Sequence, residues 1–270
     1  MSCTANRFDA ARYWKDRLAG GLTLADIGYK GLGLAYNTWL YRVRRSVFLR
    51  VAGRLPCEWR RASVLDVGSG SGFYVSIMRE LGVPALVGTD ITERSIEYLR
   101  QRYPGYSFVQ CDIGAASPDL PGGPFDIITA MDVLFHIVDD QAYERAFTNV
   151  AAHLDSGGFF IFTEPGPGHT VQTAPHSKCR SESLVLHAMR QAGMEPVAHM
   201  PVFEIMNEPV GPINKLRQCI WSGIQRIVSR GERWGFWLGA ALFPVELMLL
   251  SACDSGPSTN IFVCKKAKVG

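Results

Sequence analysis

Nine residues decide the fold: Val64-Leu65-Asp66-Val67-Gly68-Ser69-Gly70-Ser71-Gly72. The apolar start of this stretch is typical of a buried strand, and its glycine-rich end is typical of a turn before a helix, which we expect over residues 73–81. A backbone without side chains at Gly68 and Gly70 lets a bulky ligand approach closely, and a helix start offers free N–H groups. The stretch therefore predicts a nucleotide-like ligand at a strand-to-helix turn.

Short apolar runs alternate with segments of helical spacing from this stretch onward. The runs cover residues 64–67, 85–89, 106–110, 125–130, 159–163 and 196–200. Thr92, Asp139 or Asp140, and Ser181 are suited to cap the helices between the runs. This alternation predicts a doubly wound α/β fold, in which helices cover both faces of a parallel sheet.

Two regions lie outside this rhythm, one before the first strand and one before the last. Apolar residues recur at helical spacing between Tyr36 and Val51 in the first region, and again between Ile213 and Ile227 in the second. We therefore expect a helical extension on the substrate side at residues 1–61, a core at 62–206, a helical apolar insertion at 207–257, and the final strand with a tail at 258–270.

Composition indicates a globular protein with one substantial core, since 47% of the 270 residues are hydrophobic. The net charge is +3, but residues 1–62 hold 12 basic and 4 acidic residues, so they carry +8 and the remainder carries 3 − 8 = −5. Such a basic front end suits an acidic partner, a membrane surface or an anionic substrate. Dispersed arginines are also common on solvated helix faces.

The seven cysteines form no C-x-x-C pair and show no metal-ligand spacing. We therefore expect reduced thiols, no structural disulfide, no metal site and a cytoplasmic location. Residues 1–17 carry charges of both signs and do not resemble a secretory signal.

The most apolar part of the insertion runs from Trp234 to Leu250. It contains Pro244 and Glu246 and spans 17 residues, slightly fewer than a bilayer crossing needs. We expect a buried or lid helix pair here; an interfacial membrane helix is the next alternative, ahead of a spanning helix. In a lid, Trp234 and Trp237 are candidate contacts for an aromatic or lipid-like molecule.

Two further acids come directly after strands of the predicted sheet. Asp90 ends the second apolar run, and Asp112 comes after the third. The carboxyl ends of parallel strands line the ligand crevice of a doubly wound sheet, so Asp66, Asp90 and Asp112 should arrive at the same edge. At this place the carboxylate of Asp90 can accept hydrogen bonds from the two hydroxyls of a ribose.

The spacing of the glycines separates two classes of nucleotide ligand. A dinucleotide site needs G-x-G-x-x-G, whereas this chain has G-x-G-x-G, with Phe73 where the last glycine of that fingerprint would stand. Asp66 would repel a pyrophosphate but can hold the ammonium group of a methionine moiety, directly or through water. The pattern therefore favours a ligand with such a moiety over a dinucleotide.

Asp66-x-Gly68-x-Gly70-x-Gly72 resembles motif I of the class I S-adenosylmethionine-dependent methyltransferases. Asp90 is similar to their acidic ribose ligand, and Cys111-Asp112-Ile113 is similar to their adenine-contacting segment. The resemblance covers about residues 62–200 and 258–265. It implies a Rossmann-like, mostly parallel sheet of seven strands, in which the final strand, near Thr259 to Lys265, runs antiparallel beside the fifth.

The resemblance also implies the cofactor, S-adenosylmethionine, with S-adenosylhomocysteine as its product. The residues that its motifs assign to cofactor binding are Asp66, Gly68, Ser69, Gly70, Gly72, Asp90, Ile91, Cys111, Asp112, Ile113 and Met131. Similar small-molecule methyltransferases carry a histidine just after the fourth strand. His136 is therefore a candidate general base.

Candidate contacts for the methyl acceptor lie on the loop after the fifth strand, because this loop leaves the same edge of the sheet. They are Glu164, His169 and His176. We expect Arg180, at the end of this loop, to bind an acidic group or to support the next helix.

We expect methyl transfer to a small apolar or aromatic metabolite, with O-methylation favoured. The segment Ala130-Met131-Asp132-Val133 lacks the N/D/S-P-P-aromatic signature of amino-methyltransferases that act on nucleic-acid bases, so we expect no nucleic-acid partner. Peripheral membrane contact through the insertion stays open. Three other functions stay open too: RNA or protein methylation through the basic front end, nicotinamide-dependent oxidoreduction, and cofactor binding without catalysis.

Overall fold

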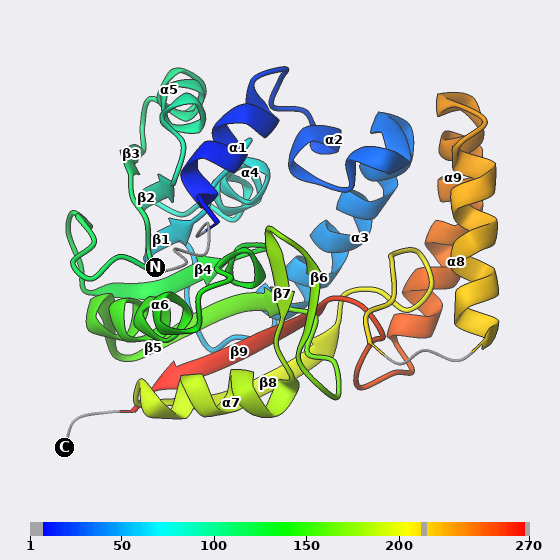
Figure 1. Cartoon of the computed structure of the whole chain (residues 1–270). Helices are drawn as coiled ribbons and strands as arrows, with labels where there is room; N and C mark the ends of the chain where they lie inside the picture. The colour runs from blue at the N-terminus through cyan, green and yellow to red at the C-terminus, as the bar shows by residue number, and fades with distance from the viewer. Residues whose placement is uncertain (1–7, 212–214, 268–270) are drawn as a thin grey trace, which may run out of the picture.

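The computed structural model describes residues 8–211 and 215–267 (Figure 1). Its core is a seven-stranded sheet with the strand order β3-β2-β1-β4-β5-β9-β8. The strands are β1 (Ser63–Val67), β2 (Ala85–Asp90), β3 (Ser107–Gln110), β4 (Phe125–Ala130), β5 (Leu154–Glu164), β8 (Met194–Pro201) and β9 (Asn260–Lys266). The first five strands are parallel, and β9 runs antiparallel between β5 and β8. This topology confirms the predicted fold class.

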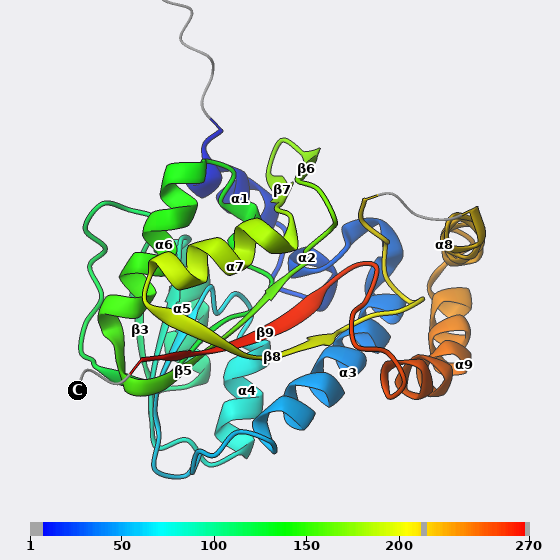
Figure 2. The ribbon, with the colours of Figure 1, turned by 90° about the horizontal axis from the view of Figure 1, so that it is seen from below.

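Successive residues of the central strands enter two separate cores, because side chains of a strand point alternately to opposite faces. Val64 and Ile127 belong to the core beneath α3 (Gly33–Ala52), α4 (Phe73–Glu80) and α5 (Glu93–Arg102). Leu65 and Ile128 belong to the core beneath α6 (Asp140–His153) and α7 (Glu182–Gln191). Figure 2 shows α3 and α4 on one face of the sheet and α6 and α7 on the other.

The helices begin at the predicted capping residues. Thr92 Oγ1 accepts the N–H of Ser95 at 3.4 Å before α5, and Asp139 Oδ1 accepts the N–H of Ala142 at 2.8 Å before α6. Ser181 stands at the N-cap of α7, but its side chain makes no capping hydrogen bond.

The N-terminal region folds into α1 (Ala10–Leu18), α2 (Leu24–Ile27) and η1 (Lys30–Leu32) ahead of α3. Arg17 fastens α1 to the end of α2, since its guanidinium donates to the carbonyl oxygens of Asp26 at 2.8 Å and Gly28 at 2.6 Å. Arg94 of α5 donates to the carbonyl of Ala19 at 2.9 Å. These bonds hold α1 close to the edge of the sheet where the parallel strands end.

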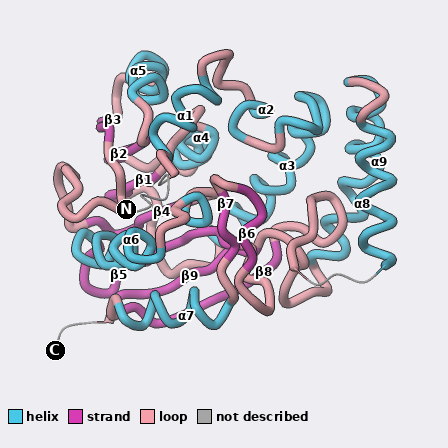
Figure 3. Tube along the Cα trace, in the orientation of Figure 1, coloured by secondary structure: helices cyan, strands magenta, loops and turns pink. Residues whose placement is uncertain are grey.

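The insertion forms α8 (Lys215–Val228) and α9 (Glu232–Leu250), which lie at the end of the molecule remote from β3 (Figures 1 and 3). We expected a buried or lid helix pair here, and the lid alternative is wrong, because neither helix lies over the strand ends. α9 packs along α3 instead, with Gly239 against the indole of Trp39. The two helices have 19 and 20 residues, so packing side by side buries apolar surface along their whole length.

The stretch after the fifth strand, expected as an irregular loop, contains a hairpin. Its strands are β6 (Val171–Ala174) and β7 (Ser177–Cys179), which pair antiparallel and form a separate two-stranded sheet (Figure 3). A short 3-10 helix, η2 (Leu134–His136), comes after β4 and packs beside β7.

Candidate functional site

A cavity of about 470 Å³ lies where β1, β2 and β4 end. One side, which we call the motif wall, contains all the predicted cofactor residues except Asp66 and Gly72: Gly68, Ser69, Gly70, Asp90, Ile91, Cys111, Asp112, Ile113 and Met131. The cavity is also lined by aromatic residues together with His136, a set that we call the aromatic wall: Phe8, Trp14, Tyr41, Phe73, Tyr74 and His136. Residues of α1 therefore line the cavity at the strand ends.

The glycines of the turn after β1 serve two different purposes. Gly70 has a φ of +52°, and a Cβ built on it would meet nothing closer than Ile27 Cγ2 at 3.7 Å, so its side of the cavity is open. Gly72 has a φ of +79°, and a Cβ there would come within 2.8 Å of Leu99 and Tyr103. Gly70 gives access to the cavity, whereas Gly72 allows the turn to pack against α5.

Asp90 stands at the end of β2 and is buried, with 8% of its surface exposed. Its Oδ2 accepts the N–H of Gly70 at 2.9 Å, while Oδ1 accepts the N–H and the hydroxyl of Thr92 at 2.8 and 2.7 Å. Burial raises the pKa of Asp90, although these hydrogen bonds oppose the shift. A carboxylate oxygen can accept two hydrogen bonds, so Oδ2 keeps one acceptor position for a ligand hydroxyl.

The segment after β3 completes the motif wall. Burial, and then the nearby carboxylate of Asp112, raise the pKa of the Cys111 thiol to about 11, so the thiol is neutral at pH 7. Asp112 Oδ1 accepts the N–H of Gly114 at 2.9 Å, which shapes the turn. Ile91 and Ile113 add apolar surface on this side of the cavity.

Asp66 lies behind the motif wall and does not line the cavity. Its carboxyl group is 2% exposed, and Oδ1 accepts the hydroxyl of Thr129 at 2.6 Å. Burial raises its pKa to about 6. In this arrangement Asp66 ties β1 to β4, and the structure does not bring it to the cavity surface where the sequence pattern placed it.

His136 faces the cavity from η2. Its Nδ1 lies 2.9 Å from the carbonyl oxygen of His176, and a carbonyl oxygen can only accept, so Nδ1 carries the proton and Nε2 keeps a free lone pair. Burial lowers the pKa of His136 to about 4, so the ring is neutral at pH 7. Trp14 meets the ring edge-on at a centroid distance of 4.9 Å. His136 is thus held in the tautomer that a general base requires.

A buried ion pair supports the aromatic wall. Arg44 Nε of α3 donates to Asp132 Oδ2 at 2.7 Å, and the two side chains are 10% and 18% exposed. The guanidinium also lies over the rings of Tyr41 and Phe203, at 5.0 and 4.8 Å from their centroids. Asp132 has a φ of +60°, a strained conformation for a residue with a side chain. The pair fixes the start of the segment that carries His136.

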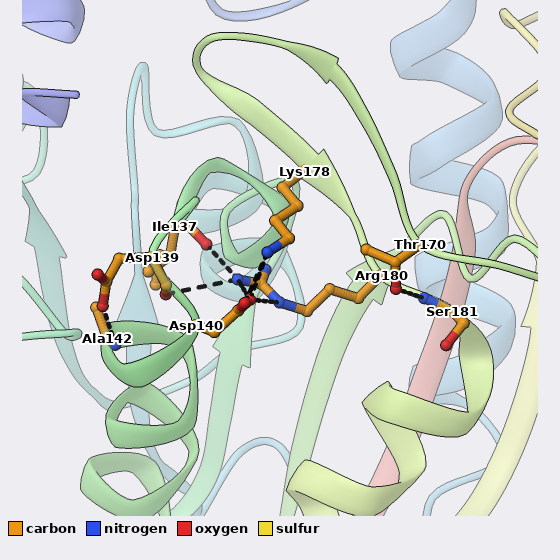
Figure 4. Close-up of polar contacts among 8 residues, drawn as sticks. All are labelled: Ile137, Asp139, Asp140, Ala142, Thr170, Lys178, Arg180 and Ser181. Carbon is orange, nitrogen blue, oxygen red and sulfur yellow. Dashed lines mark hydrogen bonds and ion pairs between the residues drawn. The ribbon is translucent and has the colours of Figure 1, made fainter. Parts of the chain in front are cut away.

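The β6–β7 hairpin is anchored to the cavity wall from outside (Figure 4). Lys178 Nζ reaches both carboxylate oxygens of Asp140, at 2.8 and 2.7 Å. Arg180, buried at 3% exposure, donates to Asp140 Oδ1 and to the carbonyl of Ile137, both at 2.9 Å. The hairpin also supplies the carbonyl of His176 that orients His136. Arg180 therefore supports the segment between η2 and α6.

Comparison with known proteins agrees with this geometry. Residues 64–158 match the model of a methyltransferase domain family. The ubiquinone biosynthesis O-methyltransferase of Albidiferax ferrireducens is 28% identical over 112 residues, which cover 40% of this chain and 42% of that protein. The chain thus spans less than half the length of this relative.

Two solved structures show the same fold over most of the chain. The [4+2]-cyclase SpnF has a TM-score of 0.54 at 19% identity and covers 83% of this chain and 82% of its own. The 1,6-didemethyltoxoflavin-N1-methyltransferase of Burkholderia thailandensis, bound to 1,6-didemethyltoxoflavin and S-adenosylhomocysteine, has a TM-score of 0.51 at 18% identity and covers 85% and 79%. The chain thus shares the fold of these two proteins, and residues 64–158 resemble a methyltransferase domain.

Several predicted site residues lie outside the cavity. Glu164 is completely buried below the hairpin, where burial raises its pKa to about 8. His176 contributes its carbonyl, while its ring stacks on Tyr13 at 4.3 Å. His169 stands on the exposed loop before β6. Trp234 and Trp237 are exposed on α9, away from the cavity.

The pattern of residues did not reveal the aromatic wall of the cavity. Trp14 and Tyr41 belong to the helical extension, which shows no motif, and Arg44 has the spacing of a solvated helix face. One feature of the sequence indicated that Arg44 is partly buried: it lies between Tyr41 and Phe48, two residues that α3 buries. In the part of the chain that the structure describes, no cluster of three His, Cys, Asp or Glu side chains could hold a metal ion.

Proposed function

We propose that this chain transfers a methyl group from S-adenosylmethionine to a small aromatic or apolar molecule, with an oxygen atom as the favoured acceptor. One observation carries the proposal: a single cavity joins the motif wall to an aromatic wall that contains His136. Methyl transfer requires two molecules to meet in line, and a shared cavity provides this alignment.

The motif wall fits the cofactor. The open side of Gly70 admits a ligand close to the backbone, and the remaining acceptor position of Asp90 Oδ2 suits a ribose hydroxyl. Ile91 and the Cys111–Ile113 segment would lie along an adenine ring. When bound, the cofactor supplies an electrophilic sulfonium methyl group.

The aromatic wall fits a flat, apolar acceptor. Trp14, Tyr41 and Phe73 offer apolar ring surface, so an aromatic acceptor loses contact with water on entering. A hydroxyl acceptor must lose its proton during transfer, and His136 can take that proton at Nε2. The name of the Albidiferax relative, an O-methyltransferase, supports oxygen as the acceptor atom.

Three arginines of the basic front end are engaged within the protein. Arg44 is paired with Asp132, Arg45 is paired with Glu80, and Arg50 donates to the carbonyl of Leu250 at 3.3 Å. These arginines hold the protein together and do not form an open basic surface.

Free thiols support the cytoplasmic location that we propose. They are the cysteines at 57, 111, 179, 219, 253 and 264.

The test combines binding and turnover in the full chain. Calorimetry should detect S-adenosylhomocysteine but not NAD(H), and mass spectrometry should detect methyl groups from labelled cofactor on members of a panel of phenols, quinols and amines. Transfer to phenols or quinols supports the proposal. Binding of NAD(H) alone would indicate an oxidoreductase, and saturable cofactor binding without transfer to any panel member would favour a cofactor-binding protein.

A further inference from the structure

The outward face of α9 is apolar beyond its first turn, in which Glu232 and Arg233 are exposed. Exposed residues without a charge then recur at a spacing of three or four positions, with Phe236 exposed beside them: Trp234, Trp237, Ala241, Pro244, Val245 and Met248. The exposed fractions of Trp234, Trp237 and Met248 are 53%, 67% and 65%. A helix on the surface of a globular protein normally turns polar residues to water. We call these six residues the α9 stripe.

The neighbouring helix shows that the stripe is not a general property of the insertion. The exposed residues of α8 include Gln218, Ser222, Gln225 and Arg226. Its apolar residues Trp221, Ile224 and Val228 are buried, and Leu216 in its first turn is 68% exposed. α8 is therefore an ordinary amphipathic surface helix, whereas α9 is apolar on both its buried and its exposed side.

The inner face of α9 is bound firmly to the rest of the protein. Glu246 is completely buried and accepts the backbone N–H groups of Glu204, Ile205 and Met206. Glu232, at the start of the helix, accepts the N–H groups of Leu34 and Ala35, which open α3. α9 is the one helix among the described residues that is long and apolar enough to cross a membrane. Crossing would break these bonds and place the carboxylate of Glu246 in hydrocarbon.

Positive charge borders the α9 stripe. Residues 215–250 hold five basic and two acidic side chains, a net charge of +3. The two acids are Glu232 and Glu246, whose carboxylates are engaged with backbone N–H groups. Arg230 lies over the ring of Trp234 at 5.7 Å, and Arg42 lies over the ring of Trp39, which packs against α9, at 4.1 Å. The stripe thus combines exposed tryptophans with a rim of arginines.

We propose that the α9 stripe docks this protein on the surface of an anionic phospholipid bilayer. Tryptophan prefers the interface between headgroups and acyl chains, and arginines beside it attract anionic headgroups. A second copy of the chain fits less well: a helix of 19 residues presents a strip of roughly 300 Å², while a stable dimer needs about 800 Å² from each partner. The proposal does not depend on methyl transfer.

Vesicle sedimentation of the full chain tests the docking surface. The wild type should bind vesicles of phosphatidylcholine mixed with phosphatidylglycerol more tightly than vesicles of phosphatidylcholine alone, and added salt should reduce the difference. Replacing Trp237 and Met248 by serine should weaken partitioning at least ~10-fold, because the apolar contact is lost. Arg230→Gln with Arg233→Gln should weaken it by about fivefold for each arginine, on the anionic vesicles only.

A matched control removes exposed apolar residues elsewhere. Leu184 and Val197 are 47% and 53% exposed on α7 and β8, and their replacement by serine should leave partitioning unchanged. All variants should keep the melting temperature of the wild type within a few degrees, since the replaced atoms face solvent. Three results would overturn the proposal: no binding to anionic vesicles, equal binding by the Trp237/Met248 variant, or a wild-type dimer that this variant abolishes.

Discussion

The two walls of the cavity differ in how the chain builds them. The motif wall comes from four short segments, each at the end of a parallel strand, so the sheet alone brings them together. The aromatic wall gathers Trp14, Tyr41 and His136 from α1, α3 and η2, and an ion pair and a hairpin hold it in place. Cofactor binding therefore depends on the edge of the sheet, whereas acceptor binding depends on side-chain contacts between separate helices and a hairpin.

Different interactions determine the shapes of the motif wall and the aromatic wall. At the motif wall, backbone N–H groups and glycines determine the shape, and few side chains are needed. At the aromatic wall, the buried pair Arg44–Asp132 and the contact between His136 and His176 determine it. Substitutions on one wall should therefore leave the function of the other wall unchanged.

The largest effect should result from His136→Ala on the aromatic wall. If Nε2 takes the acceptor proton, kcat should fall by about 10²- to 10⁴-fold, while the affinity for S-adenosylhomocysteine should change little. Steady-state kinetics and calorimetry measure the two quantities on the same preparation. His153→Ala, on the exterior of α6, is the matched control and should retain activity. Equal losses of kcat and of cofactor affinity would place His136 on the cofactor side.

Asp90→Ala tests the motif wall. The substitution removes the acceptor of the Gly70 N–H group and of a ribose hydroxyl, so affinity for S-adenosylhomocysteine should fall about 10- to 100-fold, as expected for hydrogen bonds to a charged group. Calorimetry gives the affinity, and circular dichroism checks that the chain is folded. Asp155→Ala, at an exposed position early in β5, is the control. Unchanged affinity would refute the ribose assignment.

The motif wall and the aromatic wall also differ in how far the sequence predicted them. The strands of the large sheet and the caps at Thr92 and Asp139 were predicted from local patterns. The antiparallel last strand and most of the motif wall were predicted from the resemblance of the motifs to a known family. The contact of Arg44 with Asp132 joins residues 88 positions apart, and no local pattern reports it. The apolar run of α9 indicated burial but not the partner, which is α3 and not the strand ends.

His136 on the aromatic wall should make the free energy of unfolding depend on pH, because burial lowers its pKa to about 4 in the folded chain. The unfolded chain has a histidine pKa near 6.5, so between these values it binds a proton that the folded chain does not. Stability is therefore present above pH 6.5 and is lost as the pH falls toward 4. From pH 6.5 to 5 the free energy of unfolding should fall by about 2 kcal/mol.

The His136→Gln variant isolates this contribution. Asp66 and Glu164, whose pKa values are raised by burial, change stability in the opposite direction, but they do so in both proteins. Urea unfolding at several pH values gives the difference between the wild type and the variant. A difference that stays constant from pH 7 to 5 would show that His136 is not buried as the structure describes.

The smallest effect should result from Lys178→Met, at the outer anchor of the aromatic wall. Lys178 and Arg180 share Asp140, whose side chain is 63% exposed, so the lysine adds little to a carboxylate that the arginine already holds. The loss of stability should stay within about 1 kcal/mol.

Arg180 is buried and also donates to the carbonyl of Ile137, so Arg180→Met should destabilise more and should lower kcat by loosening the segment around His136. Thermal unfolding and turnover of the two variants test this order, and a larger loss for Lys178→Met would mean that the hairpin depends on its exposed contact. Because neither side chain touches the motif wall, both variants should bind S-adenosylhomocysteine as the wild type does.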